Sequence, residues 1–370
     1  MTDSGMSGAA RRVLVLAPNW LGDAVMTTPL LTWLAAVAHA GDAPPLAVHL
    51  AVRRAWAPLF TRDNRLAGIH VIERQGRHRG VLGLIRMAHM LRQGNFDAVI
   101  LGPPSLRAGL AAGLAGIPRR IGYRSDGRTL LLTDGLPVAA RGSVHYSAEL
   151  VELGKRALSV FGLAAGSAAI PEPRLPGLDV IPARTFAPGP PVLALAPGTT
   201  YGEAKTWPLE RVAEFVALAA GGGRRRVLLL GDGGATAFAE ALQARSALRW
   251  GPGNEPSSQV IDMTGRTDLL DAVGLLKGCQ AFVGNDSGLM HLAAALGTPS
   301  VGIFGSSNPE WTAPRGRSTA WLAADGFDCR PCYRPTCNQA QFCLETIGAA
   351  SVLTAVDDLL GGASRTGEVS

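Results

Sequence analysis

The feature that most constrains this 370-residue chain is the alternation of short apolar runs with amphipathic helical runs. Strands are predicted at 12–17, 46–52, 96–102, 192–196, 226–231, 281–285 and 299–305. Helices are predicted at 23–40, 208–220, 268–279 and 288–296. Strand–helix–strand repeats are typical of parallel sheets covered by helices. We therefore expect an α/β fold of two doubly wound, Rossmann-like parallel-sheet domains that face each other across a cleft.

Length and composition support two domains. The chain exceeds the usual size of one hydrophobic core, and 47% of its residues are hydrophobic. An Ala-, Gly- and Pro-rich stretch at 163–191 interrupts the alternation. We expect an N-terminal domain over 1–165, a linker over 166–190 and a C-terminal domain over 191–370.

The net charge of +6 is unevenly distributed. Residues 1–185 carry 21 Lys and Arg against 12 Asp and Glu, whereas residues 186–370 carry 14 against 17. Arginine matches phosphate and carboxylate groups in bidentate geometry, so the excess favours an anionic partner for the first half. For any single arginine, a solvated surface position is an equally good explanation. Few aromatic residues and no basic helix with interleaved aromatics argue against nucleic acid.

No apolar run is long enough to cross a membrane, and residues 1–10 lack the pattern of a signal peptide. These two observations predict a cytoplasmic protein without a transmembrane segment.

The stretch "NWLGDAVMTTP" at 19–29 follows the first predicted strand and contains one carboxylate, Asp23. A carboxylate at a helix start stabilises the helix through its N–H groups and dipole. Ligands of open parallel sheets bind beyond the carboxyl ends of the strands, where Asp23 is expected. Asp23 is therefore either a helix-capping residue or a catalytic one.

The stretch "APGTTYGEAKTWP" at 196–208 follows the first strand of the second half. Gly198 and Gly202 allow close backbone approach, Thr199 and Thr200 offer hydroxyls, and Lys205 offers a positive charge. The stretch predicts a phosphate cradle, with an ordinary strand–loop–helix turn as the alternative. It lacks the spacing of a P-loop, and no G-x-G-x-x-G follows a strand.

A more specific signal is "GNDSGLMHLAAALGTP" at 284–299. Asp286 follows a strand, and Ser287 is expected to cap the helix after it. Free N–H groups at Gly288, Leu289 and Met290 predict an anion site at the helix N-terminus. His291 lies one turn further on the same face, which favours a ligand contact over simple packing.

Metal sites are weakly indicated. The D-x-D signature of metal-dependent sugar transfer is absent, so pyrophosphate charge would be met by Lys205, helix dipoles and His291. Four of the five cysteines fall in "CRPCYRPTCNQAQFC": Cys329, Cys332, Cys337 and Cys343. The C-x-x-C start is compatible with structural zinc, but the remaining spacing is irregular. Cys279 lies in an apolar helical pattern and is expected in the core.

Together, "LVLAPNWLGDAVMTTPLL", "APGTTYGEAKTWP", "VGNDSGLMHLAAALGTPSVGIFGSSNPEWTAP" and the Cys-rich segment resemble the ADP-heptose:lipopolysaccharide heptosyltransferases of glycosyltransferase family 9. The resemblance spans residue 12 to about residue 345. It implies the GT-B fold and inverting, metal-independent transfer of L-glycero-D-manno-heptose from ADP-heptose to a lipid A-linked inner core, without a cofactor. It also implies a protein peripheral to the cytoplasmic face of the inner membrane.

The same resemblance assigns residues to roles. Asp23 falls on the catalytic carboxylate, and Asp286 falls on the donor-sugar carboxylate. Phosphate contacts fall on Thr199, Thr200, Lys205, Gly288, Leu289 and His291, and Ser287 beside them is a further donor-binding candidate. The adenine-side loop falls on Gly265, Arg266 and Thr267. The acceptor side is expected in the basic first half, at Arg53, Arg54, Arg119, Arg120 and Arg124.

One family position has no direct counterpart, because only Asp232 or Glu240 could replace the carboxylate near the donor ribose. Alternative functions are a family member with a different heptosyl acceptor, a GT-B nucleotide-sugar epimerase, and a non-catalytic phosphate- or sugar-binding module.

Overall fold

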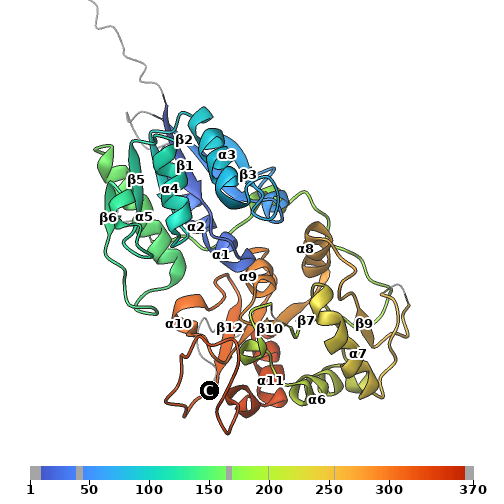
Figure 1. Cartoon of the computed structure of the whole chain (residues 1–370). Helices are drawn as coiled ribbons and strands as arrows, with labels where there is room; N and C mark the ends of the chain where they lie inside the picture. The colour runs from blue at the N-terminus through green and yellow to red at the C-terminus, as the bar shows by residue number, and fades with distance from the viewer. Residues whose placement is uncertain (1–9, 39–44, 164–168, 199, 254, 363–370) are drawn as a thin grey trace, which may run out of the picture. The chain divides into compact units, whose positions relative to one another are not determined.

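The computed structural model describes residues 10–38, 45–163, 169–198, 200–253 and 255–362. The chain divides into two compact units, Met1–Gly177 and Leu178–Ser370 (Figure 1). Each unit is built around a six-stranded sheet of its own.

The first sheet has the order β3-β2-β1-β4-β5-β6, and every neighbouring pair is parallel. Its strands are β1 (Arg11–Leu16), β2 (Leu46–Arg53), β3 (Gly68–Ile72), β4 (Ala98–Leu101), β5 (Arg119–Tyr123) and β6 (Asp134–Leu136). In register, Val13 of β1 lies opposite Val48 of β2 and Ala98 of β4. The central strands are buried on both faces, which explains their unbroken apolar runs.

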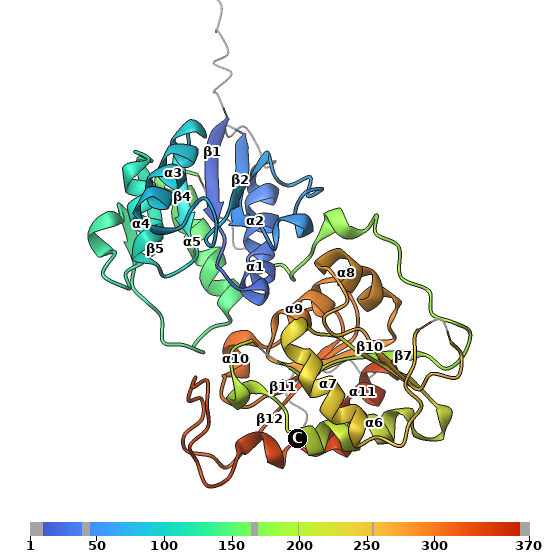
Figure 2. The same ribbon diagram turned by 45° about the vertical axis from the view of Figure 1, so that its right-hand side comes forward.

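Helices cover both faces of this sheet (Figure 2). They are α1 (Leu21–Met26), α2 (Thr28–Ala38), α3 (Gly80–Gln93), α4 (Leu106–Leu114) and α5 (Tyr146–Val160). α2 packs against α5, whereas α3 packs against α4. The core under α3 and α4 includes Leu14, Met87 and Val99, all buried.

The second sheet has the order β12-β11-β10-β7-β8-β9 and is also parallel throughout. Its strands are β7 (Val192–Ala196), β8 (Arg226–Leu229), β9 (Val260–Asp262), β10 (Ala281–Asn285), β11 (Ser300–Phe304) and β12 (Thr319–Ala323). Its helices are α6 (Leu209–Ala220), α7 (Thr236–Ala244), α8 (Leu269–Gly278), α9 (Gly288–Ala295), α10 (Pro309–Thr312) and α11 (Ala349–Leu360).

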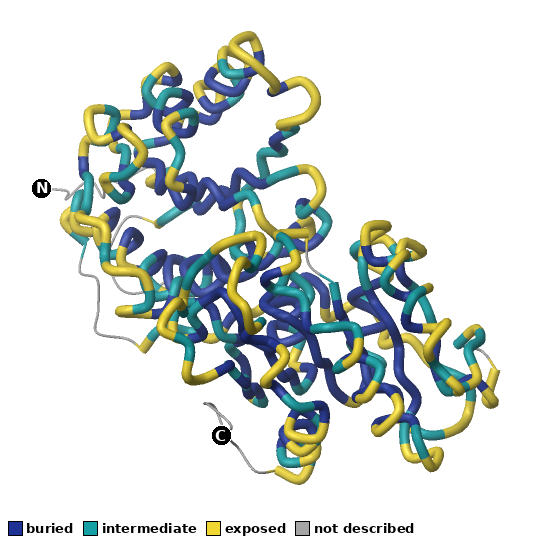
Figure 3. Tube along the Cα trace, turned by 60° about the horizontal axis from the view of Figure 1, so that its bottom comes forward, coloured by how far each residue is buried: buried dark blue, intermediate teal, exposed yellow. Residues whose placement is uncertain are grey.

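The core of the second unit lies between the sheet and the helices α6, α7 and α11. Trp207 and Phe215 pack edge to face within it, with ring centroids 5.8 Å apart. The tube in Figure 3 shows the buried class concentrated along the interior strands, while exposed residues gather in loops and on outer helix faces. Each unit therefore has its own apolar core.

Both sheets reverse their direction of winding next to their first strand. In the first unit the chain builds β2 and β3 on one side of β1 and then continues with β4 on the other side. In the second unit β8 and β9 lie on one side of β7, and β10 lies on the other. Open parallel sheets bind ligands at such switch points, beyond the carboxyl ends of the strands.

The structure differs from the predicted elements at several points. The single helix expected over 23–40 is two helices, α1 and α2, which meet at Thr27. Pro29 has no N–H to donate to the carbonyl of Val25, and that carbonyl accepts the Thr28 hydroxyl instead at 2.8 Å. Five further strands lie outside the predicted set, because their apolar runs are short or interrupted by polar residues. They are the outer strands β3, β6, β9 and β12, together with β5.

Residues 178–190, expected as part of the linker, are attached to the second unit. Lys277 of α8 donates to the carbonyls of Leu178 and Ile181 at 3.2 and 2.6 Å. The Arg226 side chain donates to the carbonyls of Ala187 and Pro190 at 2.7 and 3.1 Å.

Candidate functional site

At the switch point of the second sheet, Lys205, Asp286 and His291 form a charged cluster, in which Asp286 and His291 are buried and Lys205 is half-buried. Lys205 Nζ lies 2.5 Å from Asp286 Oδ2, and His291 Nε2 lies 3.7 Å from Asp286 Oδ1. Lys205 belongs to the loop after β7, whereas Asp286 follows β10 and His291 lies in the first turn of α9. Loops from adjacent strands thus bring together three of the residues predicted to bind the donor.

Electrostatics keep the carboxylate of this cluster charged. Burial alone would raise the pKa of Asp286, but the neighbouring His291 and the Lys205 ammonium outweigh it. They hold the pKa of Asp286 well below its ordinary value. A cation beside a permanently charged carboxylate at a helix start can exchange its partner for a phosphate when an anionic ligand enters.

Asn285 fixes the two loops around this cluster. Its side-chain oxygen accepts from the Trp207 backbone N–H at 3.1 Å, and its amide donates to the Pro197 carbonyl at 2.5 Å. These two bonds attach both ends of the predicted phosphate cradle to the end of β10. Asn285 is buried, so its hydrogen bonds are protected from water.

The N-terminus of α9 differs from the prediction in one respect. Ser287 occupies the N-cap position with an extended backbone, but its side chain makes no capping hydrogen bond. Its hydroxyl is buried without a hydrogen-bond partner within the described part of the chain. Gly288 and Leu289, which follow it, are half-buried. An unused hydroxyl beside helix N–H groups leaves capacity for an anion.

The middle of the predicted cradle lies close to the segment around Pro335. Thr199 lies outside the described residues, and Thr200 is exposed. Gly202 has a φ of 147°, and a Cβ there would lie 2.3 Å from the Pro335 carbonyl oxygen. The Ala204 N–H donates to the same oxygen at 3.0 Å. The segment around Pro335 therefore packs directly against the cradle.

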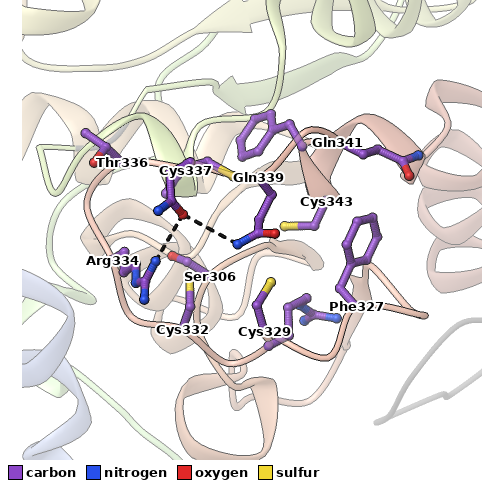
Figure 4. A pocket seen from close by; sticks show the side chains of 14 residues that line it. Ser306, Phe327, Cys329, Cys332, Arg334, Thr336, Cys337, Gln339, Gln341 and Cys343 are labelled. Carbon is purple, nitrogen blue, oxygen red and sulfur yellow. Dashed lines mark hydrogen bonds between the residues drawn. The ribbon is translucent and has the colours of Figure 1, made fainter.

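This segment is the predicted cysteine cluster, and it lines a pocket (Figure 4). The side chains of Cys329, Cys332, Cys337 and Cys343 all border the pocket, and all four are free thiols. Burial raises the pKa of the Cys343 thiol. Among the described residues, no group of three or more His, Cys, Asp or Glu side chains is arranged to hold a metal ion. The cluster borders the cradle without forming a preassembled ligand set. Cys279 is buried, as predicted.

The predicted adenine-side loop follows β9, two strands away from β7 at the same edge. Gly265 has a φ of 67° and donates its N–H to the Gly231 carbonyl at 3.0 Å. Arg266 is exposed, and Thr267 is half-buried. Asp232 follows β8 at this edge, where it accepts from the Gly234 N–H at 3.0 Å.

Glu240, the other possible ribose contact, is exposed in the middle of α7. Asp232 is therefore the better placed of the two carboxylates for a ligand at the carboxyl ends of the strands.

In the first unit, Asp23 lies at the switch point between β1 and β4. It is half-buried in the first turn of α1, whose N-cap residue is Trp20, and its carbonyl accepts the Thr27 hydroxyl at 2.9 Å. Burial, followed by the negative charge of Asp23, raises the pKa of the Tyr146 phenol well above its ordinary value. Tyr146 thus keeps its proton beside the carboxylate. Sequence reasoning missed Tyr146, because it lies 123 positions from Asp23 along the chain without any local motif.

The five predicted acceptor arginines divide between the two edges of the first sheet. Arg53 ends β2 and Arg54 follows it, so both lie at the same edge as Asp23. Arg53 donates to the Asn19 carbonyl at 3.1 Å, and Arg54 pairs with Glu73 at 2.5 Å. Arg124 follows β5 at this edge and is exposed.

Arg119 and Arg120 begin β5 at the opposite edge, where they face Ala98 and Val99 of β4. Arg119 lies 3.8 Å from Asp134, and Arg120 donates to the carbonyls of Ile117 and Leu131. The structure does not bring these two arginines to Asp23.

Arg128, which follows β5, is fully buried at the Asp23 edge. It donates to the carbonyls of Pro103 and Tyr123 and thereby joins the loops after β4 and β5. Burial lowers the pKa of Arg128. Arg128 is one of many arginines in the first half of the sequence, and no local motif marks it as buried at this edge.

Comparison with known proteins identifies the class. The solved structure of E. coli ADP-heptose lps heptosyltransferase II matches with a TM-score of 0.73 at 24% identity, covering 96% of this chain and 100% of that chain. Lipopolysaccharide heptosyltransferase 2 of Escherichia coli is 28% identical over 323 residues, covering 82% of this chain and 85% of that protein. The protein of the same name from Salmonella typhimurium is 29% identical over 323 residues with the same coverage.

Two Rossmann-like parallel-sheet units, each with polar residues at its switch point, form the GT-B fold. The model of glycosyltransferase family 9 (heptosyltransferase) matches residues 84–342, and the chain belongs to this family. None of the helices in the described ranges is long and apolar enough to span a bilayer.

Proposed function

We propose that the chain is a heptosyltransferase II that transfers L-glycero-D-manno-heptose from ADP-heptose to the heptosyl-Kdo-lipid A inner core. The names of the relatives over four-fifths of the chain support ADP-heptose as the donor and lipopolysaccharide as the acceptor class. The observation that carries the proposal is the charged cluster of Lys205, Asp286 and His291 at the switch point of the second, Rossmann-like parallel sheet. Such a cluster suits a sugar attached to a diphosphate.

In this proposal the diphosphate contacts three kinds of group: the Lys205 ammonium, the N–H groups of Gly288 and Leu289, and the hydroxyls of Thr199, Thr200 and Ser287. Lys205 moves from Asp286 toward the phosphates as the donor binds. Asp286 and His291 then face the donor sugar, and the loop 265–267 contacts the adenine. Asp232 is the candidate for the ribose contact.

Asp23 acts as the general base. The acceptor hydroxyl gives its proton to the Asp23 carboxylate while its oxygen attacks the anomeric carbon, and the bond from that carbon to the ADP oxygen breaks. Attack from the face opposite to ADP inverts the configuration. Burial and the negative charge of Asp23 keep the Tyr146 phenol protonated, so Tyr146 adds no second negative charge beside the base.

The developing charge on ADP is met by Lys205 and the α9 N-terminus, so we propose that turnover needs no divalent ion. The absence of D-x-D from the sequence supports this. Activity in excess chelator should match activity in magnesium, with a metal analysis of the protein to identify any ion held by the cysteines. Loss of turnover that magnesium restores would contradict a metal-independent mechanism.

Incubation of the full chain with ADP-heptose tests the function, with heptosyl-Kdo-lipid A, Kdo-lipid A or no acceptor. We expect ADP release and an acceptor heavier by one heptose with heptosyl-Kdo-lipid A alone. Equal or faster reaction of Kdo-lipid A would indicate a heptosyltransferase I-type acceptor. Conversion of the sugar without an acceptor would indicate an epimerase.

A further inference from the structure

The first two turns of α3 expose a group of large apolar side chains. Val81, Leu82 and Ile85 are 75%, 68% and 55% exposed, whereas Gly83 and Met87 face the core. A soluble surface helix normally turns polar residues outward, so three adjacent apolar ones indicate a binding surface. α3 lies beside α4 on one face of the first sheet (Figures 1 and 2).

Arginines surround this apolar group. Four of them, all exposed, occupy the β3–α3 loop and the second turn of the helix: Arg74, Arg77, Arg79 and Arg86. Residues 74–96 contain no Asp or Glu. We call the arginines of 74–79 together with Val81, Leu82 and Ile85 the α3 surface. Its charge is of one sign, so it complements an anionic partner.

The loop that carries these arginines is firmly held. His78 is buried, and its Nδ1 accepts from the Glu73 N–H at 3.0 Å. The His78 carbonyl accepts from Arg107 Nη2 of α4 at 2.7 Å. The loop therefore presents its arginines from a folded backbone, which lowers the entropic cost of binding.

The α3 surface lies at the edge of the sheet that carries Asp23. β1, β2 and β3 are parallel, so the loop after β3 leaves the sheet at the same edge as the loop after β1. Arg54, which follows β2, links the two regions through its ion pair with Glu73.

We infer that the α3 surface docks the enzyme on a lipid bilayer that contains anionic lipids. Val81, Leu82 and Ile85 enter the boundary between headgroups and acyl chains, while Arg74, Arg77 and Arg79 contact the headgroup phosphates. The inference rests on the proposed function for the lipid-linked substrate, which docking would bring to the edge that carries Asp23. The binding itself can be measured without catalysis.

Sedimentation of the full chain with vesicles tests the inference. The vesicles contain either phosphatidylcholine alone or one quarter phosphatidylglycerol. We expect binding to the anionic vesicles that weakens as salt is raised. The triple variant Arg74→Gln/Arg77→Gln/Arg79→Gln should bind about a hundredfold more weakly, because each basic side chain near the surface contributes roughly fivefold.

The triple variant Val81→Ser/Leu82→Ser/Ile85→Ser should lose at least about tenfold in binding, through the loss of buried apolar area. Two control variants make matched changes at exposed sites elsewhere: Arg62→Gln/Arg224→Gln/Arg317→Gln and Leu114→Ser/Val180→Ser/Leu218→Ser. Both controls should bind vesicles like the parent chain.

Equal binding of parent and α3-surface variants would overturn the inference, as would equal binding to both vesicle types. Loss of a dimer in the apolar variant, with vesicle binding unchanged, would assign the surface to a second copy of the chain. Turnover of a delipidated, soluble acceptor separates the two proposals. If the proposed function fails, this turnover is absent from the parent chain. If only docking fails, turnover persists and the vesicle results do not distinguish the variants.

Discussion

Asp23 has a structural explanation and a chemical one, and an isosteric substitution separates them. In the first turn of α1 its carboxylate interacts favourably with the helix N-terminus, and an amide can partly replace it there. An amide cannot accept the acceptor's proton. We therefore expect Asp23→Asn to keep the fold and ADP binding but to lose about 10²–10⁴-fold in turnover.

Asp126→Asn, at an exposed carboxylate in the loop after β5, is the matched control. Single-turnover rates with ADP-heptose and acceptor provide the measurement, and calorimetry provides ADP affinity. A folded Asp23→Asn enzyme with nearly normal turnover would reduce Asp23 to a helix-capping role.

Lys205 is paired with Asp286, so its removal has two effects. Loss of a charge-assisted phosphate contact of about 1.5–3 kcal/mol should weaken ADP binding by roughly 10- to 100-fold in Lys205→Met. The same change leaves the Asp286 carboxylate buried without its cation, which lowers the free energy of unfolding.

The double variant Lys205→Met/Asp286→Asn removes both charges and should recover stability without recovering ADP affinity. Titration calorimetry and chemical unfolding distinguish the two quantities. Lys155→Met, at a half-buried lysine of α5 that pairs with Glu152, is the control. Normal ADP affinity in the double variant would mean that Lys205 serves Asp286 alone.

His49 makes stability depend on pH. It is buried in β2, where burial, the charge of Arg12 and the neighbouring His70 lower its pKa from 6.5 to about 4. Between these values the unfolded chain binds a proton at His49 that the folded chain does not. The folded state therefore loses stability as the pH falls, by about 2 kcal/mol from His49 alone at about pH 5.

Chemical unfolding at about pH 7.5 and about pH 5 should show a smaller loss for His49→Asn than for the parent chain. His89→Asn, on the exposed side of α3, should keep the parent's pH dependence. Equal losses in all three proteins would show that His49 is not a source of acid sensitivity.

At the scale of elements, the cradle depends on the cysteine segment that packs against it. An alanine Cβ at Gly202 would meet the Pro335 carbonyl, and the φ of 147° is unfavourable for any other residue. Gly202→Ala should lower the free energy of unfolding by about 1–3 kcal/mol and weaken ADP binding, because the loop holding Lys205 must shift.

Gly198 offers a matched control in the same loop. A Cβ there would meet Ala235 alone, with its nearest atom at 3.5 Å, which is an ordinary contact. Gly198→Ala should therefore change stability and ADP affinity little, as measured by chemical unfolding and calorimetry. Equal effects of the two alanines would show that contact with the cysteine segment does not hold the cradle.

The sequence predicted those elements whose residues are buried on both faces. β1, β7 and β10 read as continuous apolar runs, because helices cover them on both sides. Edge strands such as β3 are half-exposed and carry no such run. The ion pair of Lys205 with Asp286 was not predicted either. These residues are 81 positions apart, and only the β7–β10 pairing brings them together.

At the scale of the whole molecule, the two units have separate sheets and separate cores. All donor-binding candidates lie in the second unit. An isolated Leu178–Ser370 fragment should therefore fold and bind ADP with nearly the affinity of the full chain.

The starting residue of such a fragment matters. Carbonyl groups of the segment 178–190 accept hydrogen bonds from Lys277 and Arg226. Arg226 Nη2, for example, donates to the Ala187 carbonyl at 2.7 Å. A fragment starting at residue 191 leaves these cations without partners, and Arg226 is almost fully buried. Buried charges without partners are strongly destabilising, so we expect this shorter fragment to unfold at a clearly lower denaturant concentration than the 178–370 fragment. Circular dichroism and ADP calorimetry on the pair provide the test. A folded 178–370 fragment that fails to bind ADP would show that the first unit supplies part of the donor site.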